Sequence, residues 1–117
     1  MGVRPIKVLL IEDHPGDAHL LREALADEKG MSFELECADR LSAGLERLAQ
    51  GGIELLLLDL GLPDSQGLDT LARTQPHAWG VPVIVLTGLQ DEILGVKAVQ
   101  MATQDYLVKG EFDGKLL

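Results

Sequence analysis

The sequence lacks several features that would assign it to particular classes of protein. Only 3% of its 117 residues are aromatic, so a core has to be built from Leu, Val, Ile and Ala. No apolar run approaches the roughly 20 residues of a membrane-spanning helix, and the run after the N-terminus is too short for a signal peptide. We therefore expect a soluble, cytoplasmic single domain over residues 1–117, with no membrane partner.

Cysteine and positive charge are also scarce. A single cysteine, Cys37, excludes an internal disulfide, as is usual in a reducing cytosol. Because it falls in a predicted strand, we expect a packed thiol. Ten basic residues face 19 acidic ones, a net charge of −9. This balance disfavours direct nucleic-acid binding and favours basic partners or cations. Trp79 is expected to fill a hydrophobic gap near a loop, although an isolated tryptophan can also mark a contact site.

What is present is an alternation of strand and helix patterns. Five helices are predicted, beginning near Pro15, near residue 40, near Leu68, at Asp91 and at Asp113. The N-cap of the second is predicted to be Asp39 or Ser42. The buried faces of the first two helices are predicted to include Leu20, Leu21, Leu41, Leu45 and Leu48. The predicted strands cover residues 6–11, 33–38, 53–59, 82–87 and 104–108. This alternation predicts βαβ crossovers and a parallel sheet covered on both faces.

Two segments define the centre and the end of the predicted fold. The run Ile53–Leu58 shows no polar alternation, so it suits a strand buried on both faces in the middle of the sheet. The fifth helix, from Asp113, is barely begun when the sequence stops. We therefore expect the chain to be a fragment of a longer protein or to have an unusually short last helix.

Chemically useful side chains stand where the predicted strands end. The carboxyl ends of parallel strands share one edge of the sheet, where open α/β proteins place their sites. Carboxylates crowded together repel unless a cation intervenes, and Mg²⁺ takes carboxylate oxygens while leaving room for a phosphoryl oxygen. A carboxylate can also act as the nucleophile toward phosphorus. The residues at this edge are Glu12, Asp13, Asp59, Thr87 and Lys109.

In these positions the sequence resembles the receiver domains of two-component response regulators, over essentially the whole chain. The resemblance implies a flavodoxin-like, doubly wound, five-stranded parallel sheet of order 2-1-3-4-5, with helices on both faces and the last helix truncated. The matching residues are the acidic pair Glu12-Asp13, the phosphoacceptor Asp59 with Pro63 and Gly67 downstream, Thr87, and Lys109.

The resemblance also implies a role for each site residue. Asp59 would accept a phosphoryl group from a phosphohistidine of a sensor histidine kinase or phosphotransfer protein. Asp13, Asp59 and the Gly61 carbonyl would bind Mg²⁺ directly, and Glu12 would assist through water. Lys109 would pair with Asp59 and then with the phosphate. The chain would catalyse only its own phosphorylation and dephosphorylation.

Thr87 and Tyr106 are the implied switch residues. They would pass the change in charge to the surface of the fourth helix, fifth strand and fifth helix, and from there to an effector domain or protein. Such domains often dimerise through that surface, so a homodimer is compatible with the resemblance. Two departures affect it: Gly110 replaces the usual Pro after Lys109, and Ala102-Thr103 replaces a Gly-Ala pair. A cis bond before a non-proline residue costs about 2.5–4 kcal/mol, so the loop holding Lys109 is expected to differ.

Other functions compete with this one. Asp59 alone would serve equally well as a helix cap. A phosphorylation-independent, receiver-like interaction module is one alternative, and the intact acidic group disfavours it. An aspartate-nucleophile phosphatase would need a second aspartate two residues after the nucleophile, where Gly61 stands. A dinucleotide or flavin binder would need a Gly-rich loop after the first strand, and the sequence has none there.

Overall fold

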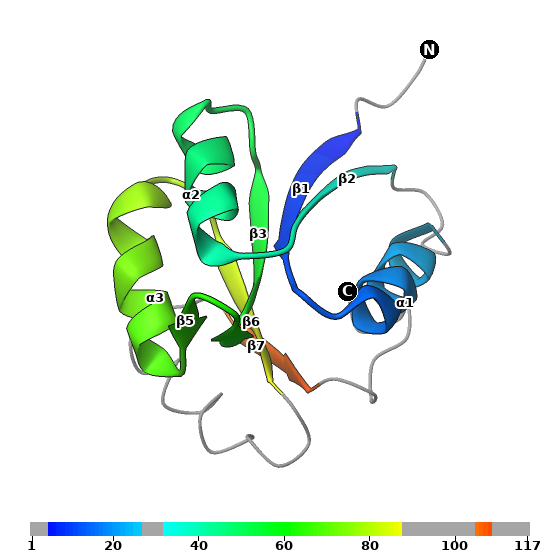
Figure 1. Ribbon diagram of the computed structural model, residues 1–117. Coiled ribbons are helices and arrows are strands. Elements are labelled where there is room, and N and C mark those ends of the chain that lie inside the picture. Colours follow the sequence, from blue (N-terminus) through cyan, green and yellow to red (C-terminus); the bar gives the residue numbers. More distant parts are fainter. Residues whose placement is uncertain (1–4, 27–31, 88–104, 109–117) are drawn as a thin grey trace.

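A five-stranded parallel sheet forms the centre of the molecule (Figure 1). The computed structural model describes residues 5–26, 32–87 and 105–108, and the statements that follow concern these ranges. The strand order β2-β1-β3-β6-β7 is the predicted order 2-1-3-4-5, so the predicted topology is confirmed. The strands are β1 (Ile6–Ile11), β2 (Phe33–Ala38), β3 (Leu55–Asp59), β6 (Val83–Thr87) and β7 (Asp105–Val108).

Helices cover both faces of this sheet. In Figure 1, α1 (Pro15–Ala26) lies on one side, and α2 (Leu41–Ala49) and α3 (Leu68–Thr74) lie on the other. A 3₁₀ turn, η1 (Gln75–His77), follows α3 directly. The predicted end of the first helix at Gly30 and the predicted helices from Asp91 and Asp113 lie outside the described residues.

The apolar run of β3 is buried on both faces, as its composition predicts. Leu56, Leu57 and Leu58 are each fully buried. Leu56 and Leu58 pack into the core beneath α2 and α3, and Leu57 packs into the core beneath α1. Because side chains of a strand alternate between faces, a strand covered twice needs apolar residues at every position. The composition of this run is therefore that of a central strand of the sheet.

Helix α2 approaches β1 closely at one glycine. A Cβ atom built on Gly44 would clash with Cδ1 and Cγ1 of Ile11, which is fully buried. The predicted inner stripe of this helix is confirmed: Leu41 and Leu48 are buried and Leu45 packs against the same core. The close approach places α2 directly over the end of β1, which leads into the acidic pair.

Several predicted apolar contacts are wrong. Leu20 is 50% exposed, because Leu21, Ala24 and Leu25 already form the buried face of α1. Trp79 is 92% exposed and fills no gap, because the neighbouring Ala78 takes the buried position. Cys37 is exposed at the edge strand β2, where Nη2 of Arg22 donates a hydrogen bond to its sulfur over 3.3 Å. Among the residues described, no helix combines the length and apolar character that crossing a bilayer requires.

Candidate functional site

The acidic pair stands at the end of β1. Glu12 is 4% exposed, and its amide donates to the carbonyl of Ala38 over 2.9 Å, which extends the pairing with β2 by one residue. Asp13 is exposed. The amide of His14 donates to Oε2 of Glu12 over 3.4 Å, and the amide of Asp17 donates to Nδ1 of His14 over 3.2 Å. The pair is thus held between the end of a core strand and the first turn of α1.

Asp59 closes β3, the neighbouring strand. It is 6% exposed and lies opposite Leu86 in the ladder with β6. Its Oδ1 accepts a hydrogen bond from the amide of Gly61 over 3.0 Å. This bond orients the carboxylate toward the loop that follows the strand. The contact is made by the main-chain amide of Gly61 and needs no side chain at that position.

The structure brings the three predicted carboxylates together. One oxygen each from Glu12, Asp13 and Asp59 lies within 4.8 Å of the others. The register explains this, because Ile11 lies opposite Leu58, so the next residues of β1 and β3 are neighbours. Clustered carboxylate oxygens suit hard cations such as Mg²⁺ and Ca²⁺, and a site with few protein ligands and room for water favours Mg²⁺. The donor set therefore fits the predicted cofactor.

The other predicted residues lie on or beyond the next two strands. Thr87 is the last residue of β6, one position past the partner of Asp59, and lies opposite Val108. The main chain of Thr87 is therefore at the same edge of the sheet as the carboxylates. Tyr106 lies on β7, opposite Val85. Lys109 follows β7 directly and lies outside the described residues.

The loop after Asp59 contains structure that the sequence analysis missed. A small antiparallel hairpin, β4 (Gly61–Leu62) and β5 (Ser65–Gln66), replaces the predicted irregular loop. Its turn carries Asp64, whose Oδ1 and Oδ2 accept hydrogen bonds from the amides of Leu41 and Ser42 over 2.7 and 2.9 Å. These bonds from Ser42 and Leu41 hold the pKa of Asp64 below its usual range.

The predicted caps of α2 are accordingly wrong. Neither Asp39 nor Ser42 caps the helix, because Arg40 occupies the N-cap position and makes no side-chain capping bond. Asp64, more than 20 residues further along the chain, supplies the cap instead. A local sequence pattern cannot show a cap contributed from such a distance. The only sequence feature that drew attention to Asp64 was its place after Pro63 in a turn shortly after Asp59.

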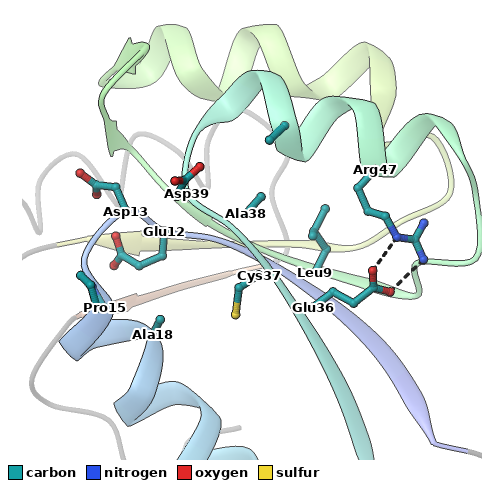
Figure 2. Close-up of a pocket in the computed structure, with 11 residues that line it drawn as sticks. Leu9, Glu12, Asp13, Pro15, Ala18, Glu36, Cys37, Ala38, Asp39 and Arg47 are labelled. Atoms are coloured by element: carbon teal, nitrogen blue, oxygen red, sulfur yellow. Dashed lines mark hydrogen bonds and ion pairs between the residues drawn. The ribbon is translucent and has the colours of Figure 1, made fainter.

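A cavity of about 520 Å³ opens beside the acidic pair (Figure 2). Glu12, Asp13 and Asp39 lie at one end of it, and Arg47 and Glu36 lie at the other. Nε of Arg47 donates to Oε1 of Glu36 over 2.8 Å, and Nη2 donates to Oε2 over 2.9 Å. This hydrogen-bonded pair lowers the pKa of Glu36. Asp59 does not line this cavity, so the carboxylate cluster only borders it.

A parallel sheet of this order with an acidic cluster at its carboxyl edge is the architecture expected of a receiver domain. Residues 8–117 match the response regulator receiver domain family. The chain belongs to this family, and it is a receiver domain of the two-component signalling type.

Individual relatives agree with that assignment. The chain is 34% identical to the KDP operon transcriptional regulatory protein KdpE of Escherichia coli, over 93% of this chain and 48% of KdpE. It spans about half the length of KdpE and of the other transcriptional regulatory proteins that it resembles. The signal receiver domain of an HD domain-containing protein from Pseudomonas fluorescens superposes with a TM-score of 0.80 at 26% identity, covering 99% of this chain and 84% of that one.

A third relative was solved with a partner. The receiver domain of the Saccharomyces cerevisiae response regulator Ssk1, crystallised with the histidine phosphotransfer protein Ypd1, superposes with a TM-score of 0.72. It is 21% identical, and the match covers 94% of this chain and 82% of that one. At this identity the likeness concerns the fold.

Proposed function

We propose that Asp59 is the phosphoacceptor of this receiver domain, and that its donor is a phosphohistidine on a sensor histidine kinase or a phosphotransfer protein. The observation that carries the proposal is the convergence of Glu12, Asp13 and Asp59 within 4.8 Å at the carboxyl edge of the sheet. The Ssk1 receiver domain, which has the same fold, was crystallised with a phosphotransfer protein. A partner of that class suits this chain.

The proposed reaction is a direct transfer between side chains. A carboxylate oxygen of Asp59 bonds to phosphorus as the bond from phosphorus to the imidazole nitrogen breaks, and the imidazole leaves with the electron pair of that bond. The amide of Gly61 fixes the carboxylate through its 3.0 Å bond to Oδ1. Burial of Asp59 at 6% exposure keeps bulk water from most of the nucleophile.

Mg²⁺ is the proposed cofactor, and its charge would offset that of the carboxylates and the incoming phosphoryl group. Asp13, Asp59 and the carbonyl of Gly61 are the proposed direct ligands, and Glu12 the one that assists through water. Thr87 and Lys109 are proposed to bind phosphoryl oxygens through a hydroxyl and an ammonium group. The position of Thr87 at the end of β6 supports this role.

The proposed output is a change of surface rather than the turnover of a separate substrate. Phosphorylation would shift Thr87 and Tyr106 and alter the face formed around β7, which an effector domain or protein would recognise. Hydrolysis of the aspartyl phosphate within the domain would reset it. KdpE, of which this chain spans 48%, is a transcriptional regulatory protein, and either an attached effector domain or a separate effector protein is proposed to receive the signal here.

The test is labelling with a small phosphodonor. Incubation with Mg²⁺ and acetyl phosphate, followed by intact-protein mass spectrometry, should show one phosphoryl adduct. Asp59→Asn should abolish it, because the amide is not a nucleophile. Asp39→Asn is the matched control: Asp39 is an exposed acid at the same end of the cavity, outside the carboxylate cluster, and its variant should label normally.

The same experiment distinguishes the proposed function from that of a phosphorylation-independent interaction module. A phosphorylation-independent module would bind its partner equally well before and after acetyl phosphate treatment, and would carry no adduct. An absence of adduct on the folded wild-type protein in saturating Mg²⁺ would overturn the proposal. An adduct of equal size on Asp59→Asn would overturn the assignment of the phosphoacceptor.

A further inference from the structure

The segment between β3 and α3, residues 60–67, is here called the phosphoacceptor loop. It contains Gly61, whose amide contacts Asp59, and it ends at Gly67, whose amide donates to the carbonyl of Leu60 over 2.7 Å. Its strands pair only at Gly61 with Gln66 and at Leu62 with Ser65. A hairpin with two residue pairs is not stable by itself. Contacts with the rest of the molecule must therefore fix its position.

Leu60 and Leu62 of the loop pack into the core, and the polar contacts that position its turn come from the two helices on the same face of the sheet. The amides of Leu41 and Ser42 in α2 donate to the two carboxylate oxygens of Asp64. On the other side, Nη1 of Arg73 in α3 donates to the carbonyl of Asp64 over 3.0 Å. Asp64 thus receives hydrogen bonds from both helices, through its side chain to α2 and through its main chain to α3.

A second contact with α3 is buried. The hydroxyl of Thr70 donates to Oγ of Ser65 over 2.8 Å. Thr70 is fully buried and Ser65 is 7% exposed. This bond fixes the end of the hairpin nearest α3, so the side chain of Asp64 is the polar contact that fixes the hairpin against α2.

We infer that Asp64 is a positioning residue for phosphoryl transfer: its carboxylate ties the phosphoacceptor loop to the N-terminus of α2 and so holds Gly61 against Asp59. The inference rests on the proposed roles of Asp59 and Gly61. Two consecutive amides at a helix N-terminus are strong partners for a carboxylate, since both the free N–H groups and the helix dipole favour negative charge. The bond lengths of 2.7 and 2.9 Å are those of charge-assisted hydrogen bonds.

The consequence is a link between the site and α2. When the Asp64 carboxylate is removed, the loop keeps its contacts with α3 and loses those with α2. Gly61 then moves more freely relative to Asp59, because its 3.0 Å bond to Asp59, its pairing with Gln66 and the buried Leu60 and Leu62 must hold it without the tie to α2. Both the amide of Gly61 and its carbonyl, a proposed Mg²⁺ ligand, would be less well placed.

The first measurement is amide hydrogen exchange by NMR on the protein without Mg²⁺ or phosphodonor. Asp64→Ala should speed exchange of the Gly61 and Gly67 amides by about threefold or more, because local opening of the loop costs less free energy. Asp64→Asn keeps a carbonyl oxygen that can accept one helix amide, and asparagine caps helices well. Its exchange should lie between those of the wild type and Asp64→Ala.

Arg47→Ala is the matched control. It weakens α2 at its other end by removing the bonds of Arg47 to Glu36 and to the carbonyl of Gly51, and it leaves the phosphoacceptor loop untouched. Its Gly61 and Gly67 amides should exchange within about twofold of the wild type, since those amides open locally and independently of that end. Equal acceleration in Arg47→Ala and Asp64→Ala would reduce Asp64 to an ordinary helix cap and overturn the inference.

The second measurement is the Mg²⁺ dependence of acetyl phosphate labelling. For Asp64→Ala, the half-saturating Mg²⁺ concentration should rise about threefold or more, with Arg47→Ala unchanged and Asp64→Asn intermediate. Unchanged exchange in Asp64→Ala, or Asp64→Asn no better than Asp64→Ala, would overturn the inference. Failure of the proposed function is distinct, because it would appear as no labelling of the wild type, whereas the exchange experiment needs neither metal nor phosphodonor.

Discussion

The carboxylates and the phosphoacceptor loop belong to one site, but they are held in different ways. Glu12 directly follows β1 and Asp59 is the last residue of β3, and the residues before them, Ile11 and Leu58, are fully buried. The loop is anchored in the core by Leu60 and Leu62, but its turn is fixed by side-chain hydrogen bonds nearer the surface, such as those of Asp64 to α2. Changes to the core should therefore affect the whole fold, whereas changes to the loop contacts should affect mainly the geometry around Asp59.

The largest expected effect comes from the strand that carries Asp59. Leu58→Ala should lower the free energy of unfolding by about 2–5 kcal/mol, because it leaves a cavity in a fully buried position. Urea denaturation followed by circular dichroism measures this. Leu20→Ala is the control: Leu20 is 50% exposed, so its variant should stay within about 0.5 kcal/mol of the wild type. Equal losses in the two variants would contradict the described core.

A smaller loss should follow when α2 is pushed away from β1. Gly44→Ala gains up to about 1 kcal/mol of helix propensity, but the added methyl group clashes with Ile11, and such overpacking costs about 1–3 kcal/mol. We expect net destabilisation. Adding Ile11→Val removes the closest atom, Cδ1, and should restore part of the loss relative to Ile11→Val alone. A stabilised Gly44→Ala protein would show that the helix has room.

Acid should weaken the side-chain hydrogen bonds before it affects the apolar core. The pKa values of Glu36 and Asp64 both lie below their usual ranges, Glu36 because of Arg47 and Asp64 because of the α2 amides. A lowered carboxyl pKa stabilises the fold above the unfolded-state pKa, near 4, and this stability is lost as pH falls through the folded-state pKa.

Glu36→Gln tests this dependence. Glu36 is 41% exposed, so the loss at pH 7 should be less than about 1 kcal/mol. The difference from the wild type should shrink as the pH falls below the unfolded-state pKa and through the lowered pKa of folded Glu36. Urea denaturation at pH 7 and in acid measures it. Glu46→Gln, an exposed glutamate on α2, is the control and should show no such convergence. A difference that persists in acid would mean that charge is not the cause.

The smallest expected effect is at Gly61. A Cβ atom there would meet Oδ1 of Asp59 at 3.9 Å, an ordinary contact, and Gly61 is not among the glycines with positive φ. Gly61→Ala should change stability by less than about 0.5 kcal/mol and keep phosphoryl labelling, because its role is in the main chain. Gly67→Ala, at φ 64°, should cost about 1–3 kcal/mol. A large loss in Gly61→Ala would contradict a main-chain role.

The part of the site that lies on strands could be predicted from the sequence. The apolar run before Asp59 and the β-branched run before Glu12 have the lengths and patterns of buried parallel strands, and their shared edge follows from the topology. The same logic placed the main chain of Thr87 correctly. The structure gives the positions of Glu12, Asp13 and Asp59, but their roles in phosphorylation stay predictions, as do those of Thr87, Lys109, Tyr106 and Gly61.

The parts that failed depend on contacts between residues far apart in the sequence. Asp64 caps α2 across more than 20 residues, and helical periodicity carries no information about a cap from another segment. Packing was predicted for Trp79 from its residue type and for Cys37 from its position in a strand, but burial depends on which neighbours take the available space. The small hairpin, with two residue pairs, is too short to give an alternating pattern.

The exposure of Trp79 has an optical consequence. It is the only tryptophan in the sequence, and its indole already contacts water in the folded protein. Its emission should therefore shift little on unfolding, so fluorescence would give a poor denaturation curve where circular dichroism gives a good one. A blue shift or quenching of this emission on mixing with a tryptophan-free protein would instead report binding at the surface around η1, because no other tryptophan contributes to the signal.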